Sequence, residues 1–140
     1  MTRVLYFADT AYWIGVINPK DSYHHKAVEV TKTIGNVSLV TSEFVLAETL
    51  NAFSATGRFL RSKAYIFVKR LYLEPHIAII PQNHTLFRRA LDKYGLYEDT
   101  EWGLVDCASF VIMDDHFITD ALTTDHHFVQ AGFNALMREQ

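Results

Sequence analysis

The chain has 140 residues, of which 49% are hydrophobic and 21% are charged, and its formal net charge is −3. This composition supports a packed core and excludes global disorder, while the single cysteine, Cys107, excludes an internal disulfide. No apolar run approaches the ~20 residues that cross a bilayer. We therefore expect one domain over residues 1–140, in a reducing cytoplasm and without a membrane partner.

The expected elements alternate between strands and helices along the chain. A β-prone run over 3–8 ends at Asp9, and a helical pattern follows and reaches Ile17. The later elements are a helix over 22–34, a strand over 37–40, a helix from Ser42 to about 56–57, a helix over 59–73, a strand over 77–80, helices over 85–94 and 102–114, and strands over 118–123 and 133–137. This alternation is typical of an α/β protein with a mostly parallel sheet.

Charge is unevenly distributed along the chain. Residues 49–73 hold no acid and five bases, which are Arg58, Arg61, Lys63, Lys69 and Arg70. Residues 92–125 hold nine acids and one base, Lys93. A polyanion could lie on the first region while metal ions gather in the second, although two solvated faces explain the charges equally well.

Three acids fall at or near the carboxyl ends of expected strands, where parallel sheets form their ligand sites. Asp9 ends the first strand, Asp125 follows the strand that closes at 122–123, and Glu48 lies nearly two turns into the helix after strand 37–40. Each has a plainer alternative. Asp9 and Asp125 could cap helices, and Glu48 could be an exposed helical residue.

A fourth acid, Asp106, lies within the apolar helix expected over 102–114. A carboxylate in such surroundings is costly unless it is paired, hydrogen-bonded or bound to a metal. Four carboxylates on four elements could converge into one pocket, and their mutual repulsion would call for a divalent cation. Because all the ligands would be oxygens, Mg²⁺ or Mn²⁺ is favoured over zinc.

The adjacent histidines His126 and His127 are a second candidate for a metal site. Neighbouring residues on a helix diverge by ~100°, so the pair is poorly placed to hold one ion together. We expect surface or capping roles for both, at the start of the helix after Asp125.

Four segments carry these acids: Phe7-Ala-Asp-Thr10, Thr41-Ser-Glu-Phe-Val-Leu-Ala-Glu48, Trp102-Gly-Leu-Val-Asp-Cys107 and Ala121-Leu-Thr-Thr-Asp-His-His-Phe128. In order and spacing they resemble the four acidic motifs of PIN-domain ribonucleases, most closely the VapC-type toxins of type II toxin–antitoxin pairs. The resemblance runs from Val4 to about Phe133. It implies a three-layer αβα fold with a central, mostly parallel sheet.

The resemblance also implies roles for individual residues. The catalytic, metal-binding acids would be Asp9, Glu48, Asp106 and Asp125. Asp99 would be an accessory acid, although a loop residue capping the next helix explains it as well. Thr10 and Thr124 match hydroxyl residues that support the acids. Relatives often carry a base where this chain has Thr100 and a serine where it has Gly103.

The activity implied is Mg²⁺- or Mn²⁺-dependent hydrolysis of RNA phosphodiester bonds by an endoribonuclease, which we expect to be a homodimer neutralised by a cognate antitoxin. The five bases of residues 49–73 could contact the RNA backbone, or could instead pair with the antitoxin or a partner subunit. Two other functions are compatible with the sequence. One is a catalytically weak or inactive PIN-like module that binds RNA or protein. The other is a different Mg²⁺-dependent phosphoryl-transfer domain, although Lys93 is the last lysine and none follows the late strand.

Overall fold

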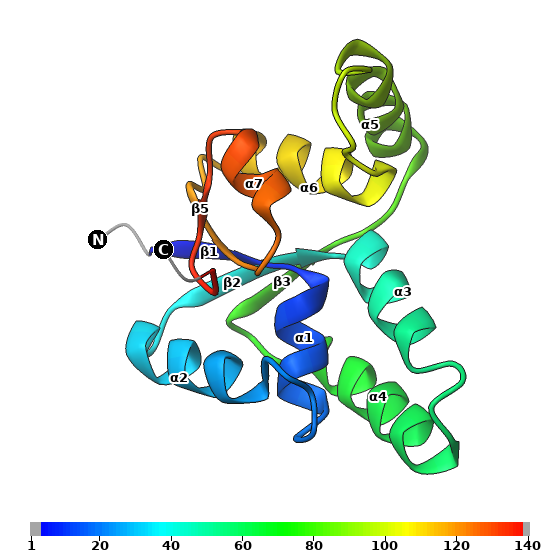
Figure 1. Ribbon diagram of the computed structural model, residues 1–140, viewed down its shortest axis with the longest axis vertical. Coiled ribbons are helices and arrows are strands. Elements are labelled where there is room, and N and C mark those ends of the chain that lie inside the picture. Colours follow the sequence, from blue (N-terminus) through cyan, green and yellow to red (C-terminus); the bar gives the residue numbers. More distant parts are fainter. Residues whose placement is uncertain (1–3, 139–140) are drawn as a thin grey trace.

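The computed structural model describes residues 4–138, which form a five-stranded sheet and seven helices (Figure 1). In chain order the elements are β1 (Leu5–Ala8), α1 (Thr10–Ile17), α2 (His24–Ile34), β2 (Ser38–Ser42), α3 (Glu43–Ala52), α4 (Arg58–Leu71), β3 (Ile77–Ile80), α5 (His84–Leu96), α6 (Leu104–Asp115), β4 (Asp120–Leu122), α7 (His126–Gln130) and β5 (Asn134–Ala135). None of the described helices is long and apolar enough to span a membrane.

The sheet is parallel at every pairing and has the strand order β3-β2-β1-β4-β5. Figure 1 shows α5, α6 and α7 on one face of the sheet, and α1, α2 and α4 on the other. The expected three-layer αβα architecture with a mostly parallel sheet is therefore confirmed. The start of the first strand, expected at residue 3, lies outside the described residues.

Tertiary contacts account for two of the helix boundaries that differ from expectation. Helix α3 ends at Ala52, and Phe53 turns into the core beside Ile17. Helix α6 begins at Leu104 rather than at 102. The ring of Trp102 packs edge-on against Phe110, and its Nε1 donates to the Gln130 side chain at 3.3 Å. These contacts fix Trp102 ahead of the helix.

The residues after β1 and β2 are held by local hydrogen bonds. Ser42 caps α3, as expected, and its hydroxyl accepts the N–H of Val45 at 3.1 Å. Beside it, the fully buried Thr41 hydroxyl donates to the Ala8 carbonyl at 2.8 Å and accepts the Trp13 indole N–H at 3.1 Å. One hydroxyl thus joins β2, β1 and α1 next to the end of β1.

This network generates a stability prediction. Thr41→Val keeps the shape of the side chain but leaves the Trp13 N–H and the Ala8 carbonyl without their partner. We expect a loss of about 1–3 kcal/mol in the free energy of unfolding, measured by urea denaturation. The matched control is Thr33→Val on α2, whose exposed hydroxyl bonds only to the Glu29 carbonyl of its own helix; it should cost less than about 0.5 kcal/mol. Equal stabilities of the two variants would contradict the role of Thr41.

Candidate active site

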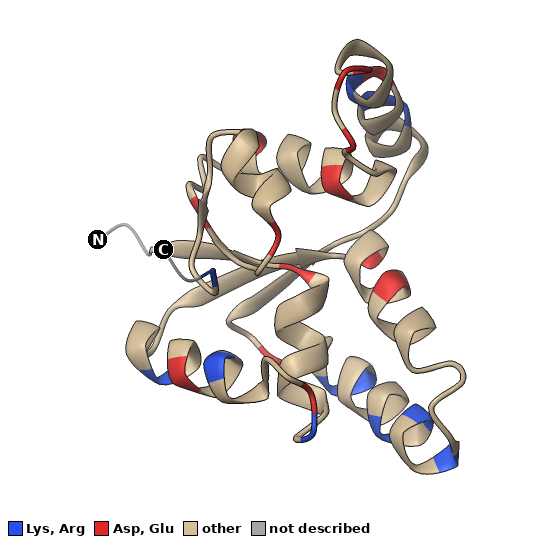
Figure 2. Cartoon of the chain, in the orientation of Figure 1, with Lys and Arg blue, Asp and Glu red and all other residues tan. Residues whose placement is uncertain are grey.

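The acids come from adjacent strands at one edge of the sheet. Strands β2, β1 and β4 are neighbours, and their carboxyl ends lead to Glu48, Asp9 and Asp125. Asp106 comes from the first turn of α6, which packs above this edge. In Figure 2, Asp and Glu segments lie at the end of β1, ahead of α7, at the start of α6 and on α3, whereas Lys and Arg are spread along α4.

Asp9 is the most enclosed of the four acids and is only 6% exposed. It occupies the N-cap position of α1, but its side chain makes no capping hydrogen bond with that helix. Its Oδ2 instead accepts the Thr123 hydroxyl at 2.8 Å. The same hydroxyl accepts the N–H of Asp125 at 3.1 Å, so Thr123 connects the ends of β1 and β4. Helix capping alone therefore does not explain Asp9.

Asp106 and Asp125 each use one carboxylate oxygen for protein contacts. Asp106 Oδ2 accepts the Gly103 N–H at 3.1 Å and lies 3.0 Å from His127 Nδ1. Asp125 Oδ1 caps α7 by accepting the His127 N–H at 2.9 Å. Asp106 Oδ1 and Asp125 Oδ2 bond to none of the described residues. No buried side-chain oxygen in residues 4–138 lacks a partner, so these two atoms are open to solvent.

Glu48 lies on the exposed side of α3 and is joined to the other acids by Thr10. The Thr10 hydroxyl donates to Glu48 Oε1 at 2.5 Å. Thr10 directly follows Asp9, so this bond brings the α3 carboxylate to the start of α1. A continuous series of contacts through Thr10, Thr123 and His127 thus connects all four acids.

The electrostatics agree with this proximity. The pKa of the Asp9 carboxyl is raised from an ordinary 3.8 to about 7, chiefly by burial. Hydrogen bonds from the Thr123 hydroxyl and the Thr10 backbone lower this pKa, and the charges of Asp106 and Glu48 raise it. Burial also raises the pKa of Asp106, as does the charge of Asp125, while the Gly103 N–H and His127 lower it. Asp9 and Asp106 are therefore harder to ionise because of burial and neighbouring charge, as expected for a site that holds a cation.

Two other residues expected at the site lie apart from these contacts. Asp99 is exposed in the turn between α5 and α6, and it bonds to none of the described residues. The Thr124 hydroxyl likewise contacts no acid within residues 4–138, although the Thr124 carbonyl accepts Arg138 at 3.2 Å. The hydroxyl that reaches Asp9 and Asp125 belongs to Thr123, the preceding residue.

Thr123 could have been found by aligning the strand ends. Ala8 and Leu122 are partners in the β1–β4 register, so the next residues, Asp9 and Thr123, face each other. That argument needs the strand pairing and the exact end of β4, which the sequence did not supply.

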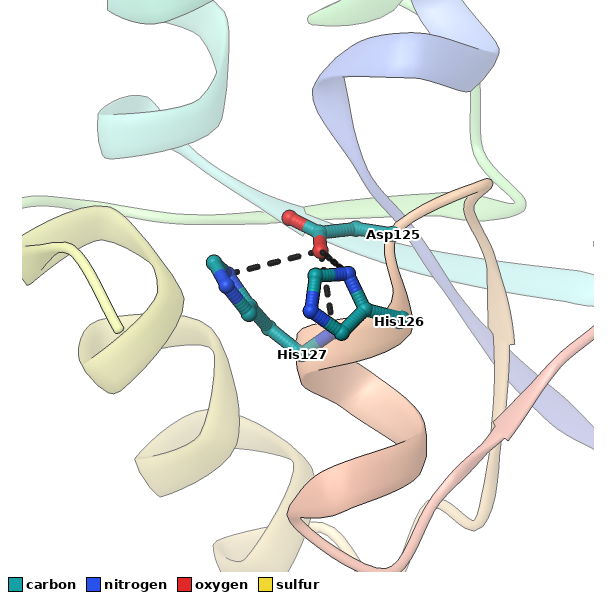
Figure 3. A group of neighbouring side chains, drawn as sticks. All are labelled: Asp125, His126 and His127. Carbon is teal, nitrogen blue, oxygen red and sulfur yellow. Dashed lines mark hydrogen bonds and ion pairs between the residues drawn. The ribbon is translucent and has the colours of Figure 1, made fainter. Parts of the chain in front are cut away.

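The histidines begin α7 as expected, but their rings do not diverge. His126 and His127 both lie beside Asp125, with ring centroids 4.5 Å apart (Figure 3). One donor atom from each of these three residues lies within 4.8 Å of the others. His126 is half exposed, at 54% of its side chain, whereas His127 is 16% exposed and also contacts Asp106. Sequence reasoning missed this bridging position of His127.

Comparisons with known proteins agree with the fold. No family model matches the chain. The 23S rRNA-specific endonuclease VapC20 of Mycobacterium tuberculosis is 26% identical over 127 residues, which cover 91% of this chain and 94% of that protein. The crystal structure of M. tuberculosis VapC20, a sarcin-ricin loop cleaving toxin, matches with a TM-score of 0.80 at 24% identity and covers 92% of this chain and 95% of that one. The crystal structure of FitAcB from Neisseria gonorrhoeae matches with a TM-score of 0.64 at 17% identity and covers 94% of this chain and 95% of that one.

The parallel αβα sheet with carboxylates beyond the carboxyl ends of its strands is a PIN-like fold. The chain is homologous to VapC20 over nearly its whole length, which confirms the resemblance to VapC-type proteins.

The raised pKa of Asp9 generates a prediction for the metal-free protein. An acid whose pKa is higher in the folded state stabilises the fold fully below its unfolded pKa, and that contribution is lost as the pH rises through the folded value. From pH 4 to about 7, wild type should lose stability relative to Asp9→Asn by on the order of 1 kcal/mol per pH unit. Urea denaturation in EDTA at several pH values measures this difference. A difference that stays constant with pH would contradict the assigned pKa.

Proposed function

We propose that the protein is a metal-dependent endoribonuclease that hydrolyses RNA phosphodiester bonds, and that it is the toxin of a type II toxin–antitoxin pair. The observation that carries the proposal is the linkage of Asp9, Glu48, Asp106 and Asp125 through Thr10, Thr123 and His127 at one edge of the sheet. The homologue is named as an rRNA endonuclease and as a toxin, and its fold is similar to that of this chain.

The residues present fit a divalent cation. The donors are carboxylates, and Asp106 Oδ1 and Asp125 Oδ2 are open while their partner oxygens are fixed by the protein. Crowding of negative charge around the buried Asp9 favours a cation as well. Oxygen ligands of this kind select Mg²⁺ or Mn²⁺. We assign Asp9, Asp106, Asp125 and Glu48 as its ligands, directly or through water, and leave Asp99 as an accessory residue without a contact.

The chemistry divides between the cation and the chain. A bound Mg²⁺ or Mn²⁺ would lower the pKa of a water molecule and offset charge on the phosphate. Thr123 and the α7 backbone hold Asp9 and Asp125 in place, and Thr10 fixes Glu48 through Oε1. Glu48 Oε2 accepts no hydrogen bond from the described residues, so it is open to take a proton from an attacking water.

Helix α4 offers a surface for polyanions and acidic partners. Arg61 is turned back to the Ser54 carbonyl at 3.1 Å, and Lys69 is exposed. The other three bases line a hollow of about 650 Å³ together with apolar side chains; its lining includes Arg58, Phe59, Lys63, Ile66, Phe67 and Arg70. We propose that the α4 bases contact RNA phosphates, and that the apolar hollow receives an acidic, amphipathic segment of the cognate antitoxin.

Asp106→Asn tests the catalytic assignment. It should lower RNA cleavage with Mg²⁺ or Mn²⁺ by more than about 100-fold, because even outer partners of a metal site cost about 10- to 100-fold. EDTA should abolish wild-type cleavage. Asp114→Asn, the same change at an exposed position on the same helix, should cleave at the wild-type rate. Equal rates for the two variants would remove Asp106 from the site. A wild type that cleaves no RNA with either metal would leave a binding module as the better account.

Helix α5 carries an exposed apolar face. Phe87, Leu91 and Tyr94 are 41%, 50% and 52% exposed, and their spacing of four and three residues puts them on one face of α5. We propose that this apolar face contributes to a homodimer. Leu91→Asp should shift the protein from dimer to monomer in sedimentation equilibrium. Leu73→Asp, at an 81% exposed position after α4, should stay dimeric. A wild type that is monomeric at micromolar concentration would contradict this part of the proposal.

A further inference from the structure

His127 contacts two of the four acids with two different groups. Its main-chain N–H donates to Asp125 Oδ1 at 2.9 Å. Its ring Nδ1 lies 3.0 Å from Asp106 Oδ2 and 3.4 Å from Asp125 Oδ1. Figure 3 shows the ring of His127 beside the Asp125 carboxylate, and the His127 side chain is only 16% exposed. Within residues 4–138, His127 is the residue whose side chain reaches both carboxylates.

The relative position of the Asp106 and Asp125 carboxylates depends on this contact, because the two residues belong to different elements. Asp106 is in the first turn of α6 and Asp125 is the N-cap of α7, and no hydrogen bond joins their carboxylates directly. Their like charges oppose a close approach. A donor between them offsets that repulsion and sets their separation.

The contact also decides which oxygens remain open. Because the acceptor is a carboxylate, Nδ1 carries the hydrogen, and a neutral ring with its proton on Nδ1 is sufficient. The His127 ring N–H and the Gly103 N–H both donate to Asp106 Oδ2, and the His127 main-chain N–H donates to Asp125 Oδ1. Asp106 Oδ1 and Asp125 Oδ2 are thereby left for a ligand.

We propose that His127 is a positioning residue: its Nδ1–H orients Asp106 and spaces it from Asp125, and this raises the affinity of the site for a divalent cation. The inference rests on the proposed function for the existence of that cation site. Metal-ligating carboxylates are commonly held by hydrogen bonds of this kind, and removing such a partner weakens metal binding about 10- to 100-fold. In this arrangement the ring holds the ligands and does not itself bind the ion.

Two amide substitutions separate positioning from direct ligation. The Asn side chain can place an N–H near the position of Nδ1, whereas the longer Gln places it near Nε2. His127→Asn should therefore bind Mn²⁺ within about 3-fold of wild type. His127→Gln and His127→Ala should bind it about 10- to 100-fold more weakly. His126→Ala is the control at the exposed neighbour and should match wild type.

Calorimetric titration of the metal-free, full-length proteins with Mn²⁺ measures these affinities without any dependence on RNA cleavage, and circular dichroism checks that each variant is folded. Equal affinities of wild type, His127→Gln and His127→Asn would overturn the positioning role and leave the proposed nuclease intact. A loss in His127→Asn as large as in His127→Gln would overturn it in favour of a nitrogen ligand. A wild type that binds no Mn²⁺ would overturn both this inference and the metal-dependent function.

Discussion

The structure depends on keeping a carboxylate, Asp9, buried at the end of the central strand next to other carboxylates. Burial and like charge both oppose its ionisation, so the pKa of Asp9 is raised to about 7. The buried Thr123 hydroxyl supplies the hydrogen bond that partly offsets this effect. A group so placed contributes little to the stability of an empty protein at neutral pH. Its position is understandable if a cation completes the site.

The fold solves the problem of assembling such a site from distant parts of the sequence. Asp9 and Thr123 are 114 residues apart in the chain and meet because β1 and β4 are neighbours in the sheet. The Thr41 hydroxyl anchors the other side of β1 by joining it to β2 and α1. Parallel strands end at the same edge, so the segments that follow β1, β2 and β4 bring Asp9, Glu48 and Asp125 to the same region. His127 then adds Asp106 from α6 to this set.

The sequence was sufficient for the parts of this arrangement that follow from regular patterns. Alternating apolar runs and breaks predicted the αβα fold, and acids just after strands predicted the edge at which Asp9 and Asp125 lie. The apolar surroundings of Asp106 indicated that it is held by partners. These inferences need only the type and order of the elements, which long periodic segments specify well.

The parts that failed depend on single-residue register or on the first turn of a helix. Strand β4 ends at Leu122, one residue earlier than expected, so the hydroxyl facing Asp9 is that of Thr123 and not Thr124. The ~100° rotation between neighbouring helical residues predicted that the side chains of His126 and His127 would diverge. Asp125 caps the helix they open, and both rings turn to its carboxylate. The first outcome requires the pairing of β1 with β4, and the second requires the geometry of the first turn of α7.

We propose that the four acids form one cation site at the carboxyl edge of the sheet. The most direct test is a crystal structure of the protein with Mn²⁺, in which anomalous scattering locates the ion. We expect a Mn²⁺ peak in contact with the carboxylates of Asp9, Asp106 and Asp125, with the His127 ring still bonded to Asp106. A peak bound by the His126 and His127 rings and away from Asp9 would contradict it.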